Sequence, residues 1–145
     1  MREVLSTWFN VTAKYDSTNE DGATIKTTAN YVVKAVSFTD AETKAIEEIA
    51  DYANGDLHIT KESIAPFMSV FFSDNEKDCK WYAVKVKLIT IDEQTGKEKK
   101  SSVPYLVQAV STSGAEKNTK DVFAETAIDF EITNVAETSI IDVFE

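Results

Sequence analysis

The sequence predicts an α+β protein of two tandem repeats, each with the order strand, strand, helix, strand, strand. We expect antiparallel sheets that each carry one packed helix, with the repeats related by a pseudo-twofold axis. The first observation is that the block Trp8-Phe-x-Val-x-x-Lys14 returns 73 residues later as Trp81-Tyr-x-Val-x-x-Lys87. Further blocks recur in the same order. We therefore expect repeat 1 in residues 1–73 and repeat 2 in residues 79–145, joined by the linker 74–78 into one compact unit.

The second observation is a hairpin signal at the start of each repeat. Glycine occurs in the turns at 19–22 and 92–96, where it supplies the positive φ that a tight connection needs. In the second hairpin, apolar residues alternate with Trp81, Lys85 and Lys87, which predicts one core face and one outer face. The residues expected on the core face are Tyr82, Val84, Val86 and Leu88.

The third observation is a helix signal after each hairpin. Thr39-Asp-Ala-Glu42 and Ser113-Gly-Ala-Glu116 fit the capping box, so we expect the helices to begin there. The first helix is expected to end near Asn54-Gly55. The stretch Pro66–Phe72 that follows is apolar on both faces, which predicts a strand buried on both sides or at the seam between repeats.

Composition excludes several classes of function. No apolar run is long enough to span a membrane and no secretory signal is evident, so a cytoplasmic protein is expected. With one cysteine (Cys79) and one histidine (His58), the usual zinc site is excluded, and we expect no metal and no cofactor. The sequence has no phosphate loop or nucleophile motif, so we expect no enzyme and no small-molecule substrate.

Charge is unevenly distributed along the chain. The 25 acids outnumber the 15 bases and give a net charge of −10, which argues against binding duplex DNA over a broad surface. The segment between Cys79 and Ser102, however, contains six lysines and three acids, so its net charge is +3. The second hairpin is therefore the expected basic region.

Both repeats place a tryptophan and a lysine at the same outward strand positions. An exposed aromatic residue followed by cations is typical of surfaces that stack unpaired bases, at about 1–3 kcal/mol per base. The alternative is that each tryptophan packs at the edge of the core or at the seam between repeats. The candidate nucleic-acid-binding residues are Trp8, Lys14, Lys34, Trp81, Lys85, Lys87, Lys97, Lys99 and Lys100.

The repeated tryptophan blocks, with 105–111, Phe-Phe-Ser-Asp at 71–74 and Ile-Asp-Val-Phe at 141–144, also carry a resemblance over nearly the whole chain. The chain resembles an uncharacterised domain family of small proteins from Bacteroides-type gut bacteria and their phages. The resemblance implies no catalytic residues. It implies that members in phage genomes are grouped with replication genes as single-stranded DNA-binding proteins. For a phage-encoded protein, it also implies action in the cytoplasm of the bacterial host.

The C-terminus, Ile140–Glu145, looks like the acidic aromatic tail with which single-stranded DNA-binding proteins recruit partners. Residues 141–144 nevertheless align with Met68–Phe71 in the other repeat. We therefore expect a strand there instead of a free tail.

The leading hypothesis is a non-catalytic nucleic-acid-binding protein that holds single strands, in the first place single-stranded DNA. The principal alternative is a protein-interaction or scaffold module, with a protein partner or self-association. A third is an acidic phage-borne inhibitor that mimics nucleic acid. Salt separates the first from the others, because single-strand binding weakens steeply with salt.

Overall fold

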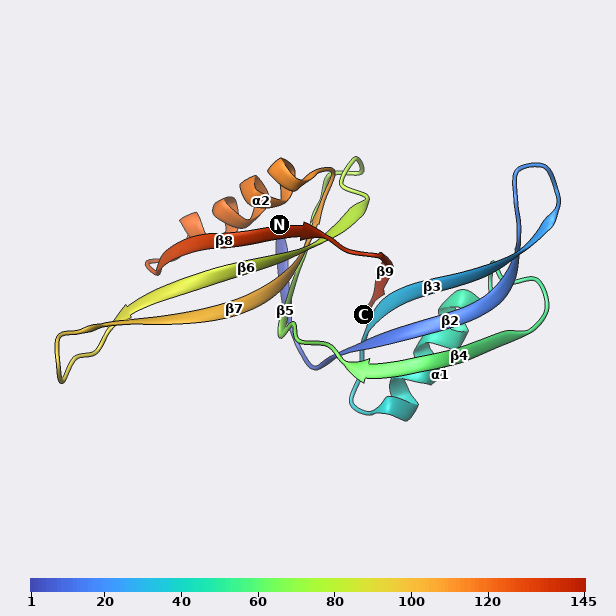
Figure 1. Cartoon of the computed structure of the whole chain (residues 1–145), viewed down its shortest axis with the longest axis horizontal. Coiled ribbons are helices and arrows are strands. Elements are labelled where there is room, and N and C mark those ends of the chain that lie inside the picture. Colours follow the sequence, from blue (N-terminus) through green and yellow to red (C-terminus); the bar gives the residue numbers. More distant parts are fainter. The chain divides into compact units, whose positions relative to one another are not determined.

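The computed structural model describes all 145 residues and shows an α+β protein with two helices and nine strands (Figure 1). The α+β class is confirmed. The elements in chain order are β1 (Arg2–Leu5), β2 (Trp8–Thr18), β3 (Thr24–Lys34), α1 (Phe38–Ile49), β4 (Leu57–Ile64), β5 (Ser69–Phe72), β6 (Lys80–Ile91), β7 (Glu98–Ala109), α2 (Thr112–Ala124), β8 (Asp129–Glu137) and β9 (Ile140–Phe144).

The chain divides into two compact units, which are described separately. Unit 1 comprises Met1–Leu5 and Phe67–Thr138, and unit 2 comprises Ser6–Pro66 and Ser139–Glu145. Each unit therefore draws residues from both of the repeats predicted from the sequence, whose boundaries stay a prediction.

Unit 2 is a four-stranded sheet in the order β4-β2-β3-β9, with α1 on one face. Alternate residues of β2 and β3 point to α1, as the period of a strand requires. They meet three helix residues spaced by four, Ala41, Ala45 and Ile49, each 0% exposed. The inward-facing side chains of the strands and of this helix face together form the core of the unit.

Unit 1 is a five-stranded sheet in the order β1-β5-β7-β6-β8, with α2 packed on one face. Tyr82, Val84 and Val86 are buried in its core and Leu88 packs against them, so the predicted core face of this hairpin is confirmed. Strand β5 lies between β1 and β7, and its first three residues are at most 4% exposed. The prediction that the apolar stretch Pro66–Phe72 forms a strand buried on both sides is confirmed only for Ser69–Phe71, because Pro66 and Met68 before the strand are exposed.

The prediction of wholly antiparallel sheets is wrong at two strand pairs. Strand β9 runs parallel to β3, and β5 runs parallel to β7. The reason is the short connection between β4 and β5, residues 65–68. A parallel crossover within one sheet needs about a dozen residues or more, so β5 joins the sheet of unit 1 instead of closing the sheet that holds β4.

Strands β9 and β5, which we call the closing strands, each place a phenylalanine against a tyrosine of the neighbouring strand. Phe144 of β9 stacks on Tyr31 of β3, with ring centroids 5.1 Å apart and ring planes at 20°. Phe71 of β5 stacks on Tyr105 of β7, also at 5.1 Å and with ring planes at 25°. The expectation that the C-terminal residues form a strand is confirmed, and the strand belongs to unit 2.

Tyr31 also lies in a hydroxyl cluster beneath the sheet of unit 2. Its hydroxyl is 2.9 Å from that of Tyr15 and accepts a hydrogen bond of 3.3 Å from that of Tyr52. Burial raises the pKa of Tyr31 well above its ordinary value, and the hydrogen bonds with Tyr15 and Tyr52 raise it further. Tyr31 therefore stays neutral, and the cluster acts as a packing element.

Both helices begin earlier than predicted. The N-cap residues are Ser37 and Ser111, whose side chains accept hydrogen bonds from the amides of Asp40 and Gly114. The prediction of caps at residues 39 and 113 is wrong because serines two residues earlier adopt the extended backbone that a cap requires. Helix α1 also ends at Ile49, five residues before the predicted stop at residue 54.

Candidate nucleic-acid interface

Each sheet has one face opposite its helix, which we call the helix-free face. In unit 2 the β2 residues on this face are Trp8, Asn10, Thr12, Lys14 and Asp16, because their neighbours in sequence point to α1. In unit 1 the corresponding β6 residues are Trp81, Ala83, Lys85, Lys87 and Ile89. These faces carry most of the strand lysines that the sequence singled out.

The prediction that the two tryptophans point to solvent is wrong. Trp8 is 0% exposed and Trp81 is 3% exposed, although both lie on the helix-free faces. Trp81 packs edge-on against Phe72, with ring centroids 5.5 Å apart, and its carbonyl accepts hydrogen bonds from Thr138. Burial of a large indole is strongly favourable, so the alternative in which the tryptophans are packing residues explains their positions.

Five of the seven predicted lysines are exposed. Lys14, Lys85, Lys97, Lys99 and Lys100 are exposed, whereas Lys34 and Lys87 are half-buried. None of them belongs to an ion pair; the ion pairs within the units are Lys44–Asp40, Lys80–Glu137 and Lys120–Glu116. In the second hairpin, Lys80 is therefore paired with Glu137, whereas Lys85, Lys87 and the lysines at 97, 99 and 100 are not neutralised by direct pairing with acids.

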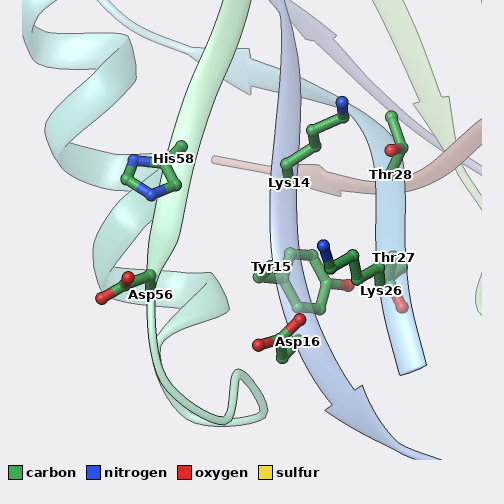
Figure 2. Close-up of a pocket in the computed structure, with 8 residues that line it drawn as sticks. All are labelled: Lys14, Tyr15, Asp16, Lys26, Thr27, Thr28, Asp56 and His58. Carbon is green, nitrogen blue, oxygen red and sulfur yellow. The ribbon is translucent and has the colours of Figure 1, made fainter. Parts of the chain in front are cut away.

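The strand register brings Lys14 into a row with residues that the sequence did not connect. Lys14 on β2 lies opposite His58 on β4 and opposite Thr28 on β3. Figure 2 shows these three side chains on neighbouring strands. Lys26, two residues before Thr28, lies opposite Asp16 on the same face. Sequence reasoning missed Lys26 and His58, because their proximity to Lys14 depends on strand pairing.

The matching row in unit 1 has a different charge. Lys87 lies opposite Glu131 on β8 and opposite Ser102 on β7. Lys100, two residues before Ser102, has the same position in its hairpin as Lys26 in the other. Lys99, opposite Thr90, alternates onto the helix side, so the structure separates it from Lys87 and Lys100.

The lysine row of unit 2 lines a groove of about 510 Å³ (Figure 2). Its charged or titratable lining groups are Lys14, Lys26, His58, Asp16 and Asp56. Lysine ammonium groups and a threonine hydroxyl are donors suited to an anion such as phosphate. The other side of unit 2 has the opposite charge: the exposed acids on and after α1 are Glu42, Glu47, Glu48 and Asp51. Within this unit, the lysines of the groove and the exposed acids of α1 therefore lie on opposite sides of the sheet.

The structure shows no group of three histidine, cysteine or acidic side chains arranged to hold a metal ion. Neither helix is long and apolar enough to cross a membrane.

The protein is therefore of the α+β class and has two units. Each unit has a sheet with both parallel and antiparallel strand pairs, and lysines lie on the helix-free face of each sheet. The family model of the Domain of unknown function (DUF4494) matches residues 7–145, and the chain belongs to this family. The expectation of an uncharacterised domain family that spans the chain is thereby confirmed. No curated protein and no solved structure matches the chain.

Proposed function

We propose that this protein binds single-stranded nucleic acid, in the first place single-stranded DNA, through its backbone phosphates and without catalysing a reaction. The observation that carries the proposal is the pair of lysines on each helix-free face. Lys14 with Lys26, and Lys87 with Lys100, have corresponding positions in the two hairpins. None of the four belongs to an ion pair, although the chain as a whole carries −10.

A single strand suits this arrangement better than a duplex. Duplex binding needs positive charge over a broad surface, whereas a single strand can follow a narrow groove with a few cations. Lys85 and Lys97 extend the charge along the second hairpin. Because the tryptophans are buried, base stacking on them forms no part of the proposal. Affinity then depends on phosphate contacts and is sensitive to salt.

We also infer that the two repeats descend from one duplicated segment. Three features support this. The strand series β4-β2-β3-β9 corresponds to β8-β6-β7-β5, and the phenylalanine of each closing strand stacks on a tyrosine. The pairing of β2 with β4 and that of β6 with β8 each contain a register shift at the corresponding position. The shifts lie between Thr12 and Ala13 and between Lys85 and Val86. The pseudo-twofold relation, the phage or Bacteroides origin and action in the bacterial cytoplasm stay predictions.

A protein-interaction module is the second candidate function. Phe38 and Ile64 of unit 2 are 45% and 62% exposed, and both lie beside Phe9: Phe38 through a ring contact at 5.1 Å and Ile64 through strand pairing. Exposed apolar residues close together favour a protein partner or self-association. The acidic surface along α1 suits the third hypothesis, mimicry of nucleic acid. Neither of these functions requires the lysine faces.

The lysines are tested by a pair of variants with equal net charge. The double variant Lys14→Gln and Lys87→Gln is expected to lose about 1–2 kcal/mol of affinity for labelled oligo-dT, about 5- to 30-fold in Kd, because each exposed charge contact contributes up to about 1 kcal/mol. Fluorescence anisotropy at low salt measures it. The control is Lys77→Gln with Lys117→Gln, two exposed lysines away from these faces. Equal losses in both double variants would show that only the net charge matters.

A further inference from the structure

The four groups Lys14, Lys26, Thr28 and His58 on the helix-free face of unit 2 are available for a ligand. Their side chains make no hydrogen bond or ion pair with the protein. The neighbouring polar side chains are engaged with one another. The hydroxyl of Thr12 donates to Asn30 at 2.8 Å, Asn30 donates to Ser139 at 2.8 Å, and the hydroxyls of Ser17 and Thr27 are 2.7 Å apart.

The acids of the groove restrict where an anion can bind. Asp16 lies opposite Lys26, and Asp56 lies two residues before His58 on the same stretch of chain. Both acids repel a phosphate from their end of the groove. The favourable place is therefore the row of His58, Lys14 and Thr28, which has one fixed cation, one hydroxyl donor and one imidazole.

The corresponding row of unit 1 is less suited to an anion. Glu131 occupies the position opposite Lys87 that His58 occupies opposite Lys14. A carboxylate beside the lysine opposes phosphate binding, whereas an imidazole donates a hydrogen bond and gains positive charge in mild acid. The rows centred on Lys14 and Lys87 thus share a lysine and a hydroxyl but differ in this group.

We propose that the groove of unit 2 is a phosphate-binding subsite in which Lys14 supplies the fixed charge, Thr28 supplies a hydroxyl donor and His58 makes the binding stronger in mild acid. That the phosphate belongs to a nucleic-acid strand rests on the proposed function, whereas the subsite itself does not. Because β4 is an edge strand, β2 is its only neighbour in the sheet, and α1 lies on the other face.

Four charged groups line the groove together with His58. They are Lys14 and Asp16 from β2, Lys26 from β3, and Asp56 just before β4. The two lysines and the two carboxylates carry equal and opposite charge. A proton on the imidazole therefore makes this end of the groove positive, and phosphate binding favours that proton.

The test uses the full chain and its single histidine as a probe. The imidazole Hε1 signal of His58 is followed by NMR at about pH 6, with inorganic phosphate and separately with oligo-dT. Both ligands are expected to move the signal. In Lys14→Gln the shift is expected to fall several-fold, while in Lys87→Gln, the matched variant of unit 1, it should persist.

The affinity for oligo-dT supplies a second readout. It is expected to rise about threefold or more between about pH 7.5 and about pH 5.5, and this rise should disappear in His58→Gln. A signal that phosphate leaves unmoved, or that moves equally in Lys14→Gln, would overturn the subsite. If oligo-dT binds but neither ligand moves the signal, the subsite fails and the single-strand function stands. If phosphate moves it but oligo-dT does not bind, the subsite stands and the function fails.

Discussion

Replacing Trp81 with alanine is expected to lower the free energy of unfolding by about 3–5 kcal/mol, because the change removes a buried indole and leaves a cavity. Trp81 is 3% exposed and packs edge-on against Phe72 at 5.5 Å. Urea denaturation followed by circular dichroism measures the loss. The single-strand affinity of the folded variant, at a temperature where it stays folded, is expected to stay close to that of the parent.

The control for this change is Ile91→Ala, which truncates a residue of the same strand that is 69% exposed. Its cost is expected to stay within about 0.5 kcal/mol. A base-stacking role predicts the reverse pattern for Trp81→Ala: nearly unchanged stability and about 1–3 kcal/mol of lost single-strand affinity. Observation of that pattern would contradict the packing role assigned to this residue.

Replacing Phe144 with alanine is expected to cost about 3–5 kcal/mol of stability, although Phe144 is the second-last residue of the chain. The ring is 9% exposed and stacks on Tyr31, so its loss removes both buried area and an aromatic contact. Phe71→Ala, at the corresponding position of β5, should cost about as much because its stack on Tyr105 has nearly the same geometry.

The neighbouring variant Ile141→Ala provides the comparison, because Ile141 lies on the same strand but is 61% exposed. Thermal unfolding of the three variants measures the difference. If Phe144→Ala is no less stable than Ile141→Ala, β9 does not hold the sheet of unit 2 together, and a mobile C-terminal tail would describe these residues better.

Local patterns predicted local structure well. The alternation from Tyr82 to Leu88 gave the core face of β6, and the apolar stretch before Phe72 gave a strand buried on both sides. Helix starts were predicted within two residues, and the error arose because serine, threonine and acidic residues follow one another there and fit two overlapping caps. Which of two neighbouring residues becomes the N-cap is decided by the backbone geometry, and the sequence pattern does not show that geometry.

Features that depend on pairing between distant segments were not predicted. Strand β5 pairs with β7 in parallel, and β9 pairs with β3 in parallel; we attribute this arrangement to the short connection between β4 and β5. The row of His58, Lys14 and Thr28 follows from the register of strand pairing. The burial of Trp81 was not predicted because alternation assigns a residue to a face without showing what packs on that face. For the same reason Lys99 was grouped with Lys100, although neighbouring strand residues point to opposite sides.

The salt dependence of oligo-dT binding by the unaltered protein tests the proposed function most directly. The two lysine contacts in each unit predict that log K falls with log salt at a slope of about −1.4, because each contact contributes about −0.7. Affinity measured by anisotropy should then fall about 7-fold between about 50 and about 200 mM salt. Absence of binding at about 50 mM salt, or binding with a slope near zero, would contradict phosphate binding by Lys14 with Lys26 in unit 2 and by Lys87 with Lys100 in unit 1.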